Sequence, residues 1–359
     1  MRAPAAMESA PESDRLEDAP HPRETSAFFG QARAEATLLD AYRSGRLPHA
    51  WILGGPEGIG KATLAWRFAR FLLAHPDPRA PAVARARDLS VDPSHPVAHR
   101  VAQRSHGDVA LLRREWDARA KKHFTAIRVD DVREAQTLFQ RSAAAEGYRL
   151  AIVDCAEDLN ANAANALLKL VEEPPARSLF LIVAHRPGLI MPTIRSRCAR
   201  LLLDPLPPDA IEAAVAALGE PWSAHDPADI SAAAAQAEGS VRKALAWLDP
   251  QAQGFARMIE TMLAELPRFD PAQAHRLADL VSPRGTEARF AALLDAAQRW
   301  LDARLRQNGA TPAMLAPYAA VWEKLRAAAA EAEAYNLDRR PLVLSLVRDL
   351  AEAERRALG

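Results

Sequence analysis

The sequence has few cysteines, few aromatic residues and no excess of either charge. Its 359 residues include only two cysteines, Cys155 and Cys198, and 6% aromatic residues. Two cysteines far apart in the chain exclude a disulfide framework and favour a reduced, cytoplasmic protein. The 46 Lys and Arg residues balance 46 Asp and Glu residues. No global positive field would therefore hold the chain on DNA, and any nucleic-acid contact must be local or made through a partner.

Long apolar runs are also missing. No segment approaches the roughly 20 apolar residues of a membrane helix, so the sequence predicts no membrane association. The first residues are rich in Pro, Glu, Asp and Ala and have little to bury, which predicts a disordered leader over residues 1–24. The rest has the composition of an ordered protein, with 49% hydrophobic residues and enough length for two or three domains.

Strand and helix patterns alternate from residue 25 to residue 205. Apolar runs typical of strands occur at residues 50–53, 109–112, 148–154 and 179–184. Amphipathic helical patterns accompany them, which predicts an α/β domain whose parallel sheet is covered by helices on both faces. After Pro205 the strand patterns stop. Helical patterns then predict a small helical domain over 206–250 and an all-α domain over 251–359.

A glycine-rich loop joins the first apolar strand to the next helix. Residues 55–61 match the first seven places of the phosphate-binding loop G-x-x-x-x-G-K-[ST]. The stretch contains Gly55, Gly58, Gly60 and Lys61. Glycines let backbone N–H groups wrap a phosphate, and a lysine neutralises it at a helix N-terminus. The pattern predicts a nucleotide pocket by descent. The alternative is a glycine-rich turn that only connects strand and helix.

Two groups that ATP hydrolysis requires are absent from this pocket. Ala62 stands where a hydroxyl would bind Mg²⁺, and Thr63 lies one residue late, about 100° round the helix. Asp154 ends an apolar strand and could orient Mg²⁺ through water. Cys155 follows it, where a carboxylate would polarise the attacking water. ATP and Mg²⁺ binding stay open, whereas hydrolysis in this chain's own site is not expected.

An ordered set of motifs in the α/β region resembles bacterial clamp-loader subunits. The set consists of N-A-L-L-K at residues 165–169, E-E-P-P at residues 172–175, and S-R-C at Ser196, Arg197 and Cys198. The resemblance implies an AAA+ domain over 25–205, a helical lid over 206–250, and a C-terminal collar over 251–359 through which subunits oligomerise. The defects in the pocket match the delta-prime branch, whose nucleotide site is commonly degraded, better than the motor subunits.

The resemblance also implies roles for single residues. Arg197 would act in trans as an arginine finger on the γ-phosphate held by an adjacent motor subunit, with Ser196 and Cys198 as its motif neighbours. A guanidinium suits this task because its planar fork can bind two phosphate oxygens. The alternative is a surface arginine in a salt bridge. Arg242 resembles the second sensor arginine of the lid, and its alternative is a surface charge. His185 replaces the family's small polar sensor residue, which argues against ATP sensing.

Many members of this family hold a structural zinc with four cysteines after the phosphate-loop helix, and this sequence has none there. His95, His99 and His106, with Asp92 and Asp108, could be combined into a site. Zn²⁺ prefers four ligands in a closed site, however, so solvated loop histidines are the preferred interpretation. No metal site is predicted.

The partners implied by the resemblance are clamp-loader motor subunits (gamma/tau) and a delta subunit, in a hetero-oligomer that reaches the sliding clamp and primed DNA. The assembly would belong to the DNA polymerase III holoenzyme, a DNA-directed DNA polymerase and nucleotidyltransferase. The first rival is an active AAA+ ATPase, a motor subunit of a clamp or helicase loader, which requires Thr63 or Glu157 to rescue magnesium binding and hydrolysis. The second is a small-molecule P-loop kinase, which leaves the helical tail without a purpose.

Overall fold

The computed structural model describes residues 11–16, 18–140, 147–283, 286–306, 312–335 and 338–358. The chain divides into two compact units, Met1–Leu245 and Ala246–Gly359. Across these described ranges, no helix combines the length and the apolar character needed to cross a membrane.

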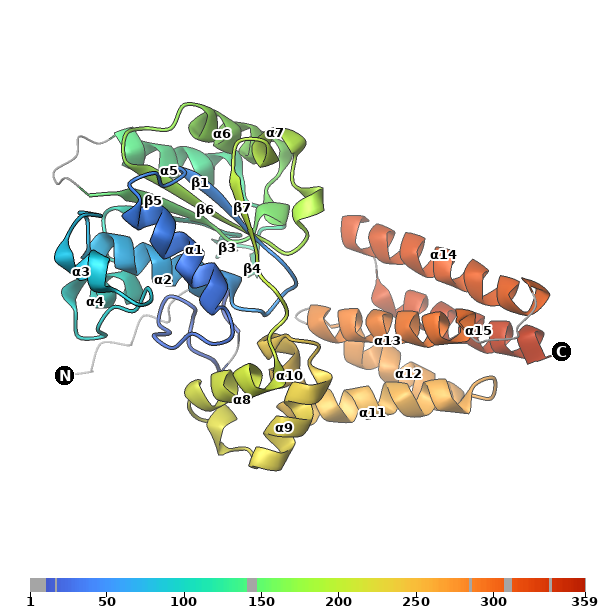
Figure 1. Ribbon diagram of the computed structural model, residues 1–359. Coiled ribbons are helices and arrows are strands. Elements are labelled where there is room, and N and C mark those ends of the chain that lie inside the picture. Colours follow the sequence, from blue (N-terminus) through green and yellow to red (C-terminus); the bar gives the residue numbers. More distant parts are fainter. Residues whose placement is uncertain are drawn as a thin grey trace, which may run out of the picture. The chain divides into compact units, whose positions relative to one another are not determined.

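A five-stranded parallel sheet forms the centre of the first unit (Figure 1). Its strand order is β2 (Val109–Leu112), β5 (Arg149–Val153), β6 (Ser178–Ala184), β1 (Ala50–Gly54) and β7 (Ala199–Leu202). All neighbouring pairs are parallel. The central strands β1 and β6 are buried along their whole length, which explains why their sequences are continuous apolar runs.

Helices cover both faces of this sheet, because alternate strand residues point to opposite sides. Leu181 of β6 joins the core beneath α1 (Ala32–Arg43) and α2 (Lys61–Ala74), whereas Ile182 joins the core beneath α5 (Val129–Gln140) and α6 (Ala161–Glu172). The short helix α7 (Pro192–Arg195) follows on the α6 side. The predicted fold class, an α/β parallel sheet with helices on both faces, is confirmed by this topology.

Several short elements were not predicted. β7 pairs with β1 at the sheet edge, and its residues alternate between half-buried and exposed, so it lacks the apolar run of the central strands. A small antiparallel hairpin, β3 (Trp116–Asp117) and β4 (Lys122–His123), follows β2. The short helices α3 (Pro81–Arg85) and α4 (Pro96–Ala102) lie between α2 and β2.

A helical segment follows the sheet and comprises α8 (Pro208–Ala217), η3 (Trp222–Ala224), α9 (Pro227–Gln236) and α10 (Val241–Leu248). We call this segment the lid. Gly239 connects α9 to α10 with φ +82°, a value that L side chains rarely adopt. A Cβ at Gly239 would come within 2.3 Å of Pro205 Cβ. Glycine is therefore required where the lid packs on the sheet domain. We call this sheet domain, residues 25–205, the base.

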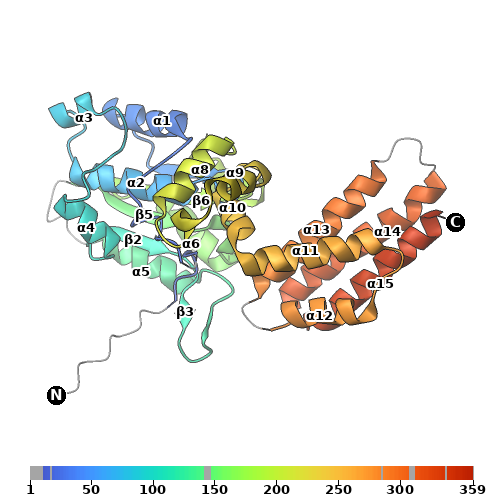
Figure 2. The ribbon, with the colours of Figure 1, turned by 90° about the horizontal axis from the view of Figure 1, so that it is seen from below.

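The second unit is built from α11 (Pro250–Glu265), α12 (Pro271–Val281), α13 (Glu287–Leu305), α14 (Pro312–Tyr335) and α15 (Arg339–Leu358) (Figure 2). Asp249 and Asp270 cap α11 and α12 by accepting hydrogen bonds from backbone N–H groups. Buried leucines and valines form a core of its own, including Leu277, Leu301 and Val347. The all-α character of this region is as predicted. Its role in oligomerisation stays a prediction.

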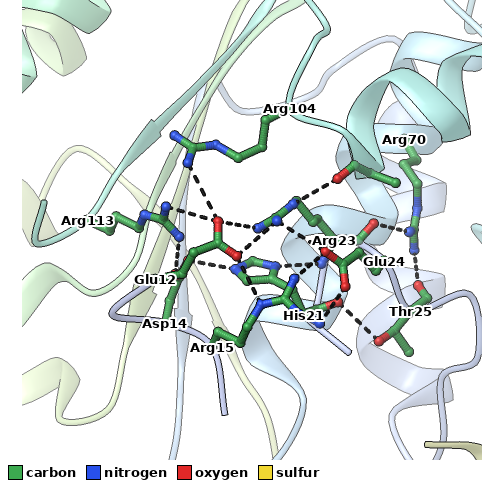
Figure 3. A network of polar contacts seen from close by, with 11 residues as sticks. Glu12, Asp14, Arg15, His21, Arg23, Glu24, Thr25, Arg70, Arg104 and Arg113 are labelled. Carbon is green, nitrogen blue, oxygen red and sulfur yellow. Dashed lines mark hydrogen bonds and ion pairs between the residues drawn. The ribbon is translucent and has the colours of Figure 1, made fainter. Parts of the chain in front are cut away.

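Residues 11–16 and 18–24 are packed against the first unit (Figure 3), although a disordered leader was predicted over 1–24. His21 is fully buried and Arg23 is 7% exposed. The expectation of disorder is therefore wrong for this part of the segment, because charge pairing rather than apolar burial anchors it. Residues 1–10 and Glu17 lie outside the described residues.

Candidate functional site

The phosphate loop lies between β1 and α2, as its sequence predicts. Gly58 has φ +79°, and a Cβ there would come within 2.2 Å of Ser240 Oγ at the start of α10. The Gly58 carbonyl accepts a hydrogen bond of 2.9 Å from the Val241 backbone N–H. Glycine is therefore needed both for the backbone conformation and because the lid packs directly on the loop.

Lys61 is turned back onto its own loop. Its ammonium group donates a hydrogen bond of 2.6 Å to the Gly55 carbonyl and another to the Pro56 carbonyl. The residue is 3% exposed, and this burial lowers the pKa of Lys61 to about 8, against the opposing effect of nearby carboxylates such as Glu57. The side chain must give up these two carbonyls before it can bind a phosphate.

The second nucleotide signature consists of Asp154, which is partly buried, and Cys155, which is buried. Burial, together with the nearby charge of Asp14, raises the pKa of Asp154 to about 7. Burial also raises the pKa of the Cys155 thiol, so this side chain stays protonated and cannot polarise water. Glu157, the rival candidate for that task, accepts a hydrogen bond of 2.5 Å from the Arg186 backbone N–H. A half-protonated Asp154 is a poor partner for Mg²⁺, since metal ligands must be deprotonated.

His185 lies at the end of β6, beside the same pocket. Burial, and next the charge of Lys61, lowers its pKa below the usual value, so the imidazole is neutral at neutral pH. Its Nδ1 atom is buried without a hydrogen-bond partner. A neutral ring offers no charge to a γ-phosphate, in agreement with the sequence-based argument against ATP sensing.

A cavity of about 420 Å³ gathers most of the predicted nucleotide-site residues. They come from the loop, from β5 and from the lid: Gly58, Gly60, Lys61, Thr63, Asp154 and Arg242. Gly55 precedes them at the end of β1 and is not part of the cavity lining. Arg242 is half-exposed and its Nη1 lies 2.9 Å from Glu57 Oε1. The structure therefore brings the two predicted signatures together and adds a lid arginine that pairs with the loop.

The S-R-C motif lies apart from that cavity. None of its three residues lines the cavity, and Arg197 follows the end of α7. Its guanidinium lies 2.8 Å from Glu172 Oε1 and donates hydrogen bonds to the Thr193 carbonyl at 2.9 Å and to Ser196 Oγ at 3.2 Å. The Arg197 side chain is 41% exposed. Glu172 belongs to the E-E-P-P motif, so the two motifs that are separated in sequence meet at Arg197.

Cys198 and Ser196 support the position of Arg197 in different ways. Cys198 is half-buried against the core of α5 and α6, and burial raises the pKa of its thiol to about 11. The Ser196 hydroxyl donates a hydrogen bond of 3.0 Å to the Thr193 carbonyl. Ser196 thus closes the turn after α7, and Cys198 fixes the chain inward, while Arg197 between them faces solvent.

Two large apolar side chains near this motif were missed by sequence reasoning. Leu189 in η2 (Pro187–Leu189) and Leu202 in β7 are each 65% exposed. Leu202 and Pro187 both lie against Gly54 at the end of β1. Exposed apolar groups that gather at one edge are typical of protein interfaces.

Comparison with known proteins finds a family similarity. A family model described as DNA polymerase III, delta subunit, matches residues 30–207, about half of the chain. The matched residues run from just before α1 to the residue that precedes α8. They include the phosphate loop, Asp154 and the S-R-C motif, so the family match covers both predicted sites.

Curated relatives carry names from the same polymerase. The DNA polymerase III subunit delta' of Pseudomonas aeruginosa is 36% identical over 152 residues, which cover 42% of each chain. The delta' subunit of Bacillus subtilis is 27% identical over 182 residues, covering 51% of this chain and 50% of that protein. The gamma/tau subunit of Mycobacterium tuberculosis is 32% identical over 200 residues, covering 55% of this chain and 32% of that protein. The alignments span half or less of these relatives.

Two of the histidines considered as zinc ligands have local roles. His95 Nδ1 accepts a hydrogen bond from the Val97 backbone N–H and so caps α4. His106 Nδ1 accepts a hydrogen bond from the Asp108 backbone N–H. In the part of the chain that the structure describes, no group of three or more His, Cys, Asp or Glu side chains is arranged to hold a metal ion.

Proposed function

We propose that this chain is the delta-prime subunit of a bacterial DNA polymerase III clamp loader and that it lends Arg197 to the ATP site of a neighbouring motor subunit. The observation that carries the proposal is the position of Arg197. Arg197 is exposed and lies outside the cavity of its own chain. Its guanidinium can therefore bind a phosphate that another molecule holds, but not one in its own cavity. Its Glu172 partner is itself exposed, which makes that pair weak and exchangeable.

The chain's own cavity supports a role without hydrolysis. Lys61 is bound to loop carbonyls, Asp154 retains a proton near neutral pH, and Cys155 cannot act as a base. Ala62 offers no hydroxyl. This donor set does not fit the Mg²⁺ ion that phosphoryl transfer requires. Of the two residues that the rival interpretation, an active ATPase motor subunit, requires, Glu157 accepts a hydrogen bond from the Arg186 backbone N–H and does not line the cavity. Thr63 lines the cavity, but one residue after the place of the magnesium-binding hydroxyl.

The proposed partners are the motor subunits (gamma/tau) and a delta subunit in a hetero-oligomer. Through that complex the chain would act on the sliding clamp and primed DNA in the cytoplasm. Support comes from the family match, from the relatives named delta' and gamma/tau, and from the exposed Leu189 and Leu202 beside the S-R-C motif. Apolar side chains at an interface core would bury this edge against the motor subunit while the arginine reaches the phosphate.

The test is ATP hydrolysis by a reconstituted loader in which only the motor subunit next to this chain keeps its phosphate-loop lysine. Arg197→Ala should slow that hydrolysis by about 10³-fold or more, because an arginine finger contributes that much in phosphoryl transfer. Assembly, followed by size-exclusion chromatography, should be unchanged. The matched control is Arg133→Ala, which removes an exposed α5 arginine paired with Asp130.

A normal rate in the Arg197→Ala loader would refute the finger role. Sustained phosphate release by the isolated chain with ATP and Mg²⁺ would instead favour the motor-subunit reading. Failure to co-purify with any motor subunit would remove the clamp-loader proposal as a whole.

A further inference from the structure

An N-terminal strap, defined as residues 11–16 and 18–24, is held by a dense set of charged contacts (Figure 3). The Glu12 carboxylate accepts two hydrogen bonds of 2.9 Å from the forked guanidinium of Arg23. It also accepts one of 3.0 Å from Arg15 and lies 3.0 Å from Arg113 Nη2. Arg104 lies 3.6 Å away. Bidentate and shared contacts of this kind fix a carboxylate in one orientation.

Asp14 forms the second half of the network. Its Oδ1 atom accepts a hydrogen bond from Arg113 Nη1, and its Oδ2 atom lies 2.9 Å from His21 Nε2 without the alignment of a hydrogen bond. Burial alone would raise the pKa of Asp14, but His21 and Arg113 together hold it at about 2. Arg113 is 3% exposed at the end of β2. This strap carboxylate therefore compensates a buried charge of the base.

The strap is anchored to the base at further points. Arg23 donates a hydrogen bond of 2.9 Å from Nε to the Ala102 carbonyl at the end of α4. Arg70, buried in α2, donates hydrogen bonds of 2.8 Å to the Arg23 carbonyl and 2.5 Å to the Thr25 carbonyl. Three elements of the base, α2, α4 and β2, thus hold one short segment.

The same strap also reaches the lid. The indole N–H of Trp222 in η3 donates a hydrogen bond of 2.8 Å to the Asp18 carbonyl. Strap residues Leu16, Ala19 and Pro20 line the cavity together with lid residues from α8 and the turn after it, namely Ala214, Ala217 and Leu218. The α8–η3–α9 part of the lid is therefore connected to the base through the strap, whereas the start of α10 is held directly by the phosphate loop.

A ligand in the cavity would make the same kind of connection, because loop residues and lid residues both line it. We propose that the strap replaces such a ligand as the tie between base and lid, and holds α8, η3 and α9 in place whether or not the cavity contains nucleotide. The strap is part of the chain itself, so the connection that it makes between base and lid does not depend on the concentration of any ligand. The lid arrangement then becomes a constant property of this subunit.

Amide hydrogen exchange of the isolated full chain tests this proposal without any partner subunit or ATP. The test variant is Glu12→Gln with Asp14→Asn, which keeps the shape of both side chains but removes both carboxylates that pair with Arg113. Arg23 then keeps only Glu24 of its two carboxylate partners. An unpaired buried arginine is strongly unfavourable, so the strap should detach. Amides of α8 and α9 should then exchange about tenfold faster or more, while those of α10 and of α13 to α15 keep their protection.

Asp18→Asn is the matched control. It also removes a strap carboxylate, but the Asp18 contact to Trp222 uses the backbone carbonyl, which the substitution retains. Asp18 has φ +56°, a conformation that asparagine tolerates. Its lid exchange should equal that of the parent chain. Normal lid protection in the double variant, with or without faster exchange in the strap, would overturn the proposal.

A second variant covers the case in which the double variant fails to fold. Trp222→Phe keeps an aromatic ring in the lid and removes only the N–H donor. Loss of one hydrogen bond should raise exchange in η3 and α9 by about fivefold. Unchanged exchange there would count against the tie. So would a parent chain whose α8 and α9 become tenfold more protected when ADP is added, because the lid would then still depend on a ligand.

Discussion

The cavity and the S-R-C edge place their charged groups in opposite ways. In the cavity, Lys61 is buried and bonded to its own loop, and the partly buried Asp154 has a raised pKa. At the edge, Arg197 is exposed and shares its charge with Glu172, also exposed. Breaking the contacts of a buried charged group costs much free energy, whereas an exposed charged group can change its partner at little cost. The difference favours the proposal that Arg197 acts on a phosphate held by another subunit rather than in the cavity of this chain.

The largest expected effect separates the charge of Arg197 from its shape. Arg197→Lys keeps the positive charge but loses the planar fork that binds two phosphate oxygens. We expect it to slow hydrolysis in the reconstituted loader by about 10³-fold, nearly as much as alanine. Steady-state phosphate release measures this. A lysine variant with more than half of the parent rate would show that the edge supplies charge alone, which would weaken the contrast with the cavity.

The next effect concerns Asp154 in the cavity. Its pKa is raised to about 7, so between about pH 4 and pH 7 the folded state holds a proton that the unfolded state releases. The contribution of Asp154 to the free energy of unfolding is thus present at low pH and is lost as the pH rises to 7. Asp154→Asn removes that loss and should stabilise the chain by about 4 kcal/mol at pH 8 and by little at pH 4.

Thermal unfolding of both proteins at pH 4, 6 and 8 would show the trend. Asp40→Asn, at an exposed position of α1, is the control and should show no such pH-dependent gain. A variant that is equally stable or less stable than the parent at pH 8 would mean that Asp154 is ionised without cost. The cavity would then resemble an open metal site, and the contrast between the two regions would fail on that side.

A smaller effect is expected at Arg70, which anchors the strap from α2. Arg70→Met keeps the aliphatic stem but leaves the Arg23 and Thr25 carbonyls without their donor. Unpaired buried carbonyls should lower the free energy of unfolding by about 2 kcal/mol. Denaturant titration measures this, with Arg79→Met at an exposed position as the control. Equal midpoints for the two variants would show that the strap contributes nothing to the base.

The smallest effect is expected at Glu172, the partner of Arg197. Glu172→Gln removes an exposed ion pair and should change the free energy of unfolding by less than about 1 kcal/mol. In the loader it should leave hydrolysis equal to or slightly faster than that of the parent, because Arg197 no longer has to leave a carboxylate. A tenfold loss of hydrolysis would show that Glu172 has a positive role at the edge.

The predictable part of the fold was the part that depends on apolar periodicity. β1 and β6 were found because strands buried on both faces are continuous apolar runs. β7 was missed because its residues alternate between half-buried and exposed at the sheet edge. The ordered strap was missed because Asp14 and Arg113 pair across 99 residues, and no local pattern marks such a contact.

The sites followed the same division. Motif spacing identified Lys61, Asp154, Arg242 and Arg197 as candidates, because these motifs are defined by residue type and spacing. It could not show that Lys61 bonds to the Gly55 carbonyl or that Arg197 pairs with Glu172, because these contacts depend on three-dimensional placement. The spacing did place E-E-P-P and S-R-C in one motif set, and that signal could have suggested their contact.

The bond from Trp222 to the Asp18 carbonyl also has a consequence for synthesis on the ribosome. The two residues are 204 positions apart, so the earliest part of the strap emerges long before its last partner exists. At about 5–20 residues per second, Trp222 is made on the order of ten seconds or more after Asp18. The strap can therefore dock on the base first, through partners such as Arg113, and its bond to the lid is the last of these contacts to become available.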